Sequence, residues 1–199
     1  MYPCLAIAFQ HGDARKAGDD LIMLGTWGAW VHTELILVHS PGRFESFAAL
    51  DTGKPTPGAG FTRSARRDFS SSPLWKVYVF PVLDLAACQG VLVHTLSCGL
   101  AYNSKDLWEC CVEFVLPMVQ NDLDCERPES WSRGVFCSQV ALLLLRRMQR
   151  VNAIAAPPSM RAAIERVHSR GCSPNYLQSL LAMHQAPLDR ATLCELMPA

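Results

Sequence analysis

The segment that decides the fold reads Trp30-Val31-His32-Thr33-Glu34-Leu35-Ile36-Leu37-Val38. Its aliphatic and β-branched residues predict a β-strand, in which successive side chains point to opposite faces. His32 and Glu34 would then share one face with Ile36 and Val38. The strand therefore places an imidazole beside a carboxylate, on a face whose other members are apolar.

The spacing of His32 and Glu34 suits acid–base chemistry. On a strand their Cα atoms lie about 6.5 Å apart, so the carboxylate can bind one ring nitrogen and leave the other free for a nucleophile. The competing interpretation is a polar pair on a solvent-facing strand. Ile36 and Val38 weigh against it, because they indicate burial, and a buried glutamate without a partner is costly.

Cys137 is the candidate nucleophile. It follows the apolar residues Val135 and Phe136 and begins a predicted helix with a continuous apolar run at 140–145. The free N–H groups and positive dipole end of a helix favour the thiolate, which is the nucleophilic form. The alternative is a buried structural cysteine, which is the expected role of most of the nine cysteines in the chain.

The rest of the pattern predicts an α+β domain that spans residues 1–199. Apolar runs in the first half predict strands, and capped apolar stripes in the second half predict helices. A Gly-, Pro-, Ser- and Thr-rich stretch at 51–73 predicts a long surface loop, which is either a lid or disordered. The remaining predicted strands are 4–9, 21–24, 44–49 and 74–80, and the remaining predicted helices are 84–97, 104–117, 159–169 and 174–184.

Composition excludes several classes of function. Lys plus Arg and Asp plus Glu number 18 each, so no net charge attracts nucleic acid. No apolar run reaches the roughly 18 residues of a membrane span. The cysteines form no CxxC pair, so we predict neither a metal site nor a cofactor. The start of the chain lacks the features of a signal peptide, which favours an intracellular, reducing location.

Several short motifs occur in an order that resembles a known family. The segments 18–23 and 30–37 resemble the opening of the circularly permuted branch of the papain-like NlpC/P60 superfamily. The stretch 101–107 is similar to its Tyr-led turn into a helix, 136–140 to its nucleophile segment, and 173–177 to its late Ser-Pro element.

The resemblance implies a papain-like α+β fold of permuted order, with an antiparallel sheet or small barrel packed against helices. It implies that Cys137 is the nucleophile, His32 the base and Glu34 the third polar member, with Tyr102 close to the site. The implied enzyme is a cysteine peptidase or amidase that cleaves an amide, peptide or isopeptide bond through a thioester.

Two alternatives stay open on the same fold. One is a lipid-directed acyltransferase or thioesterase, which an apolar groove near Cys137 would favour. The other is a catalytically idle binding or structural module. The substrate would be a peptide, a protein or a lipid-linked acyl group. Because the family has viral and bacterial members, a viral or host-associated setting is also an expectation.

Overall fold

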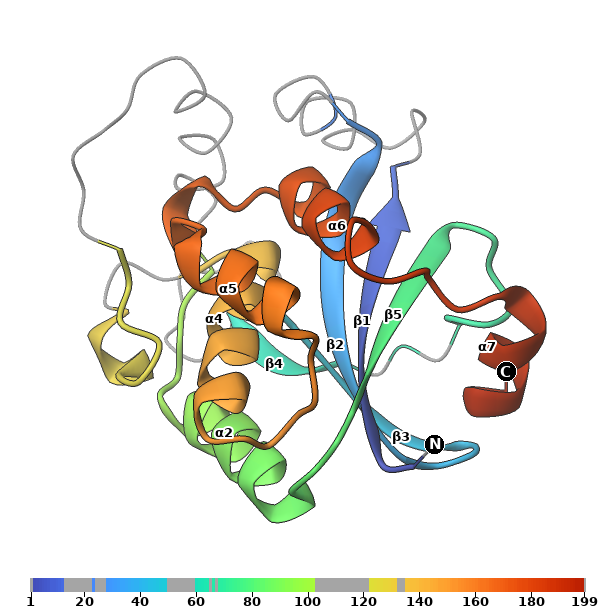
Figure 1. Cartoon of the computed structure of the whole chain (residues 1–199), viewed down its shortest axis with the longest axis horizontal. Coiled ribbons are helices and arrows are strands. Elements are labelled where there is room, and N and C mark those ends of the chain that lie inside the picture. The colour runs from blue at the N-terminus through green and yellow to red at the C-terminus, as the bar shows by residue number, and fades with distance from the viewer. Residues whose placement is uncertain are drawn as a thin grey trace.

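The computed structural model describes residues 2–12, 23, 28–49, 60–64, 66, 68–102, 122–131 and 135–198. Five strands form one antiparallel sheet in the order β4-β3-β2-β1-β5, so β2 has a neighbour on each side (Figure 1). The strands are β1 (Cys4–His11), β2 (Trp30–Ser40), β3 (Arg43–Ala49), β4 (Phe61–Ser64) and β5 (Trp75–Pro81).

The second half of the chain is helical, as the sequence predicts. Asp84 caps α2 by accepting a hydrogen bond from the N–H of Ala87, and Ser173 caps α6 through the N–H of Tyr176. The helices in the described part are α2 (Leu85–Ser97), α4 (Cys137–Arg150), α5 (Pro158–Arg166), α6 (Pro174–Ala182) and α7 (Arg190–Leu196), with 3-10 turns η1 (Pro128–Ser130) and η2 (Ser169–Gly171).

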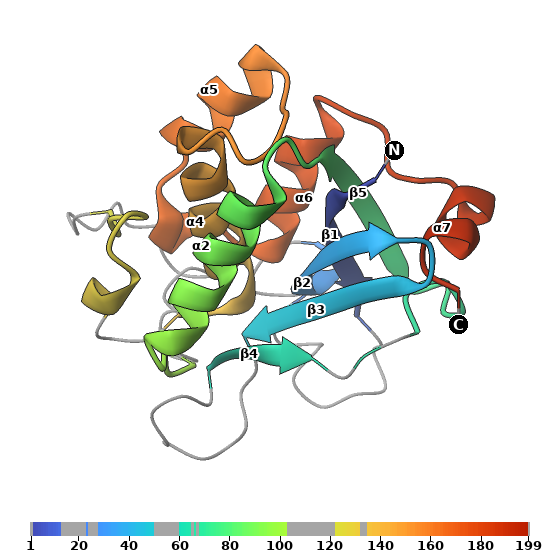
Figure 2. The same cartoon turned by 90° about the horizontal axis from the view of Figure 1, so that it is seen from below.

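Helices α2, α4, α5 and α6 lie on one side of the sheet and α7 lies on the other (Figure 2). The sheet thereby separates two hydrophobic clusters. The larger cluster joins one face, which includes Leu35 and Leu37, to α2, α4, α5 and α6. The smaller cluster lies on the opposite face, where Ile36 and Val38 meet α7 and the side chain of Trp75. This alternation along β2 is the one that the sequence predicts.

Most of the predicted strands and helices are confirmed, with shifts of a few residues at their ends. The main difference lies in the range 51–73, predicted to be a loop, because Phe61–Ser64 forms the edge strand β4. Its short and mostly polar sequence conceals it, and only Phe61 is deeply buried, opposite Ala49. The helix predicted at 159–169 ends at Arg166.

Some predictions lie outside the described residues. These are the strand at 21–24, apart from Met23, the helix at 104–117 and the first part of the predicted loop, 51–59. In the part of the chain that the structure describes, no helix combines the length and the apolar character needed to cross a membrane.

Candidate active site

Strand β2 positions the two polar residues of the predicted site. His32 lies opposite Gln10 of β1, and Glu34 lies between Ala8 of β1 and Ala48 of β3. Residues directly opposite one another in an antiparallel sheet share a face. The small side chains of Ala8 and Ala48 therefore leave space around the Glu34 carboxylate for larger polar partners.

Helix α4 begins at Cys137, and its first turn is held by side-chain hydrogen bonds. The amide oxygen of Gln139 accepts from the backbone N–H of Phe136 at 3.4 Å. The Ser138 hydroxyl donates to the carbonyl oxygen of Cys172 at 2.6 Å. These bonds fix the backbone on both sides of Cys137, at the end of the helix where free N–H groups favour negative charge.

The fold brings the three predicted residues together. His32 Nε2 lies 3.4 Å from Glu34 Oε1, and the Cys137 thiol lies within hydrogen-bonding reach of the His32 ring. The contact between His32 and Cys137 forms near the start of β2, before Glu34, which is the first residue of β2 that pairs with β3. Cys137 belongs to the helix side of the sheet, whereas His32 packs edge-on against Trp75 on the other side.

The surroundings of His32 favour the charged imidazolium. Burial alone would lower the pKa of His32, but contacts with Cys137 and Glu34 raise it to about 9. The ring therefore holds its proton through neutral pH. A protonated imidazole beside a sulfur favours the thiolate by charge attraction.

The Glu34 carboxylate has a second partner that sequence analysis missed. Its side chain is only 1% exposed, and the Nε atom of Arg66 lies 2.9 Å from Oε1. The Arg66 guanidinium also lies 5.0 Å from the centre of the Trp75 ring, in a cation–π arrangement. Arg66 lies in the range 51–73, which is predicted to be a loop. An unpaired charge on a buried glutamate is costly, so the predicted burial of Glu34 already indicated that a cation pairs with it.

Asn175 is a second residue that sequence analysis missed. Its side-chain oxygen accepts from the N–H of Trp30 at 2.9 Å, and its amide nitrogen donates to the Trp30 carbonyl at 3.0 Å. Asn175 thus connects α6 to β2 two residues before His32. It belongs to the Ser-Pro segment 173–177, but the sequence carries no signal for its partner.

Tyr102 is placed beside the nucleophile segment by the backbone. It forms an isolated parallel bridge with Val135, two residues before Cys137, and the Val135 N–H donates to the carbonyl of Ala101 at 2.9 Å. The backbone of Tyr102 therefore lies beside the segment that leads into Cys137. No chemical role follows from this bridge.

Three other buried cysteines differ from a nucleophile in their pKa. Burial raises the pKa of Cys4 and Cys125 to about 11, and that of Cys88 to about 12. These thiols stay neutral at physiological pH and pack in the two hydrophobic clusters. They fit the predicted role of small core residues.

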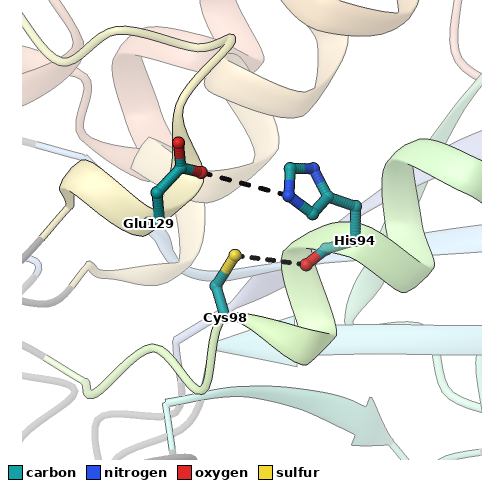
Figure 3. A group of neighbouring side chains, drawn as sticks. All are labelled: His94, Cys98 and Glu129. Carbon is teal, nitrogen blue, oxygen red and sulfur yellow. Dashed lines mark hydrogen bonds and ion pairs between the residues drawn. The ribbon is translucent and has the colours of Figure 1, made fainter.

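A cluster of potential metal ligands also occurs among the described residues (Figure 3), formed by His94, Cys98 and Glu129. Arg147 Nη2 lies 2.8 Å from His94 Nδ1, so Nδ1 must accept a hydrogen bond and Nε2 carries the hydrogen. Nε2, which lies 4.0 Å from Glu129, then has no lone pair for a metal. The cluster instead links α2, η1 and α4 by polar contacts.

Comparisons with known proteins found no relative of this chain. No family model matches the chain, and neither a curated protein nor a solved structure matches it significantly.

Proposed function

We propose that this chain is a cysteine-dependent hydrolase of the permuted papain-like type, which cleaves an amide, peptide or isopeptide bond. The observation that carries the proposal is the position of the His32 ring. It contacts Glu34 on its own strand and Cys137 at the start of a helix far along the chain. A nucleophile, a base and an orienting carboxylate are the three parts that such chemistry requires.

In the first half of the proposed reaction, the Cys137 thiolate attacks the carbonyl carbon of the scissile bond. The carbonyl oxygen gains the negative charge, and the free N–H groups at the start of α4 stabilise it. The imidazolium of His32 then donates its proton to the leaving nitrogen. The C–N bond breaks, the amine leaves, and the acyl group stays on sulfur as a thioester.

In the second half, neutral His32 takes a proton from a water molecule, which attacks the thioester carbonyl. The C–S bond breaks, the carboxylic acid leaves, and the thiolate–imidazolium pair forms again. Glu34 orients the ring and stabilises its positive charge. Because Nε2 faces Glu34, Nδ1 is the nitrogen left to exchange protons with the sulfur and the leaving group.

The chain order supports the permuted assignment. The histidine strand β2 precedes the cysteine helix α4, which is the order of the family that the sequence motifs resemble. A mixed fold with one antiparallel sheet and helices is also consistent with that family. The papain-like topology itself belongs to the proposal.

The burial of Cys137 and His32 determines which probes can reach the site. Cys137 is 2% exposed and the His32 side chain is 15% exposed, so a bulky substrate reaches the sulfur only if neighbouring groups move. A small electrophile such as iodoacetamide or a compact acyl-thioester reporter is therefore the first probe. Peptide, isopeptide and lipid-ester reporters follow, and together they identify the bond class.

The decisive variant is Cys137→Ala, with Cys194→Ala at an exposed cysteine as the matched control. We expect Cys137→Ala to remove all covalent labelling and turnover at the site while the protein stays folded, because the change removes one sulfur atom. Cys194→Ala should retain full turnover. Turnover that persists in Cys137→Ala would contradict the proposal. A wild-type protein inert to every reporter and to iodoacetamide at Cys137 would favour the idle binding module.

A further inference from the structure

Arg66, the ion-pair partner of Glu34, lies in a segment that hydrogen bonds hold against the sheet. The Ser46 hydroxyl of β3 donates to the carbonyl oxygens of Ser64 and Arg66, at 3.0 and 3.4 Å. The backbone N–H of Arg66 donates to the Ser64 hydroxyl at 3.1 Å. The chain that leaves β4 is therefore fastened to the sheet beside Glu34, and the Arg66 guanidinium is directed over the carboxylate.

The neighbouring arginine provides a contrast. Arg63, on β4 itself, has a side chain that is 64% exposed and pairs with Glu45 at 3.4 Å. Arg66 is 32% exposed, pairs with the buried Glu34 at 2.9 Å and lies over Trp75. The two arginines belong to one basic segment, yet only Arg66 compensates a buried charge.

We propose that Arg66 is a positioning residue of the catalytic site, which aims the Glu34 carboxylate at His32 through the ion pair. This inference rests on the proposed function for its catalytic meaning. The effect of Arg66 on the titration of His32 is a property of the free protein, so it can be measured without a substrate. Arg66 acts on His32 through its ion pair with Glu34.

The charges around the pair are few. Asp68 lies 3.7 Å from Arg66 Nη1, and the Cys137 thiol faces His32 from α4. Among the described residues, the neighbouring strands add only uncharged side chains beside His32 and Glu34, namely Ala8 and Gln10 of β1, Ala48 of β3 and Trp75 of β5. Within the part of the chain that the structure describes, Arg66 is therefore the cation that balances Glu34 whenever His32 is neutral.

This arrangement predicts the sign of the effect. A nearby cation makes each proton on the Glu34–His32 pair easier to lose, since it opposes positive charge and stabilises negative charge. Without Arg66, neutral His32 would leave a buried, uncompensated carboxylate, so the pair would retain its protons to higher pH. The pKa of His32 should therefore shift upward when Arg66 loses its charge.

The test is an NMR titration of the His32 ring in the full-length protein, with no substrate present. In Arg66→Met the midpoint should rise by about one unit, the order of shift that a neighbouring charge produces. The alkaline limb of any rate profile, which reports loss of the His32 imidazolium, should move to higher pH as well. Arg66→Lys, which keeps the charge, should return the midpoint most of the way, and Arg63→Met should leave it at the wild-type value.

Each outcome decides the inference. An upward shift in Arg66→Met that Arg66→Lys reverses supports it. A titration that overlays the wild type, or a shift that Arg63→Met reproduces, overturns it. Should Arg66→Met fail to fold, the double variant Glu34→Gln/Arg66→Met removes both charges. The inference requires that variant to fold, and its failure would assign Arg66 a structural role independent of Glu34.

The inference and the proposed function can fail separately. If Cys137 is inert but Arg66→Met still shifts the His32 titration, the proposed hydrolase fails and the electrostatic coupling stands. If Cys137 reacts as expected but the titration midpoint of His32 is the same in Arg66→Met as in the wild type, only the proposed role of Arg66 fails.

Discussion

The side-chain amide of Asn175 hydrogen-bonds to both backbone polar groups of Trp30, in the manner of a neighbouring strand. The contact needs a glycine at position 28, because a Cβ there would lie 2.2 Å from Asn175 Oδ1. It ties α6 to the beginning of β2, two residues before His32. The position of the His32 ring therefore depends on a residue that is distant in sequence.

Replacing Asn175 by alanine should weaken both the fold and the site. The change leaves the N–H and C=O of Trp30 without their partners, which costs about 1–3 kcal/mol for each unsatisfied buried group, less where water replaces the amide. We expect a lower free energy of unfolding in urea, and a larger fall in kcat than in substrate affinity because His32 loses its support. Tyr176→Ala, at the next and 47% exposed position, is the control. Equal free energies of unfolding for Asn175→Ala and Tyr176→Ala would show that the hydrogen bonds between Asn175 and Trp30 contribute nothing to stability.

The order of thiol alkylation is a second prediction. At pH 6 the raised pKa of His32, about 9, keeps the imidazolium beside Cys137 and so favours its thiolate. Limited iodoacetamide should modify Cys137 before the exposed Cys194, although Cys194 is far more accessible. Peptide mass mapping measures the order.

The control for this experiment is His32→Gln, which removes the titrating ring. Modification of Cys137 at pH 6 should then fall to the rate of an ordinary buried thiol, while Cys194 reacts as before. Preferential modification of Cys194 in the wild-type protein would remove the basis for Cys137 as the nucleophile.

Glu34→Gln should lower the pKa of His32. The carboxylate is one of the contacts that raise this pKa to about 9, and glutamine keeps the shape but not the charge. The imidazolium is therefore lost at lower pH, and the alkaline limb of the rate profile should move to lower pH while partial activity remains.

His32→Ala removes the ring that exchanges protons with the sulfur and the leaving group. Turnover should fall by at least the 10²–10⁴-fold that is typical for loss of a general acid–base group.

Glu45→Gln is the matched control for that variant. Glu45 lies on β3 and pairs with His39 at 3.1 Å and with Arg63 at 3.4 Å, away from His32. It should leave the His32 titration unchanged. If Glu34→Gln behaved like Glu45→Gln in rate and titration, Glu34 would not be the third member of the site.

The buried thiols predict how stability depends on alkaline pH. Cys88 has a folded pKa of about 12 against an ordinary value of 9.0, so above pH 9 the unfolded chain loses a proton that the folded protein keeps. Its stabilisation is complete below pH 9 and is lost progressively as pH rises towards 12. Each such thiol can contribute a slope of up to about 1.4 kcal/mol per pH unit. In urea unfolding between pH 9 and 11, Cys88→Ala should show a shallower fall than the wild type. An unchanged slope would mean that Cys88 is not held neutral by the fold.

Local patterns were enough to predict much of the architecture. The alternation in β2, the Asp84 and Ser173 caps and the apolar run after Cys137 each depend on neighbours within one turn or one strand. Such preferences act over a few residues, so they are readable without the rest of the molecule. Strand β4 was missed because four mostly polar residues at a sheet edge carry too little pattern.

What the sequence determined by itself is the chemical content of the site: an imidazole and a carboxylate on one strand face, and a thiol at the start of a helix. Only the tertiary structure decided which groups surround them. The ion pair of Glu34 with Arg66 and the clamp of Asn175 on Trp30 join segments that are far apart along the chain. Those pairings depend on strand register and on how α6 and the chain after β4 pack against the sheet, which no local preference encodes.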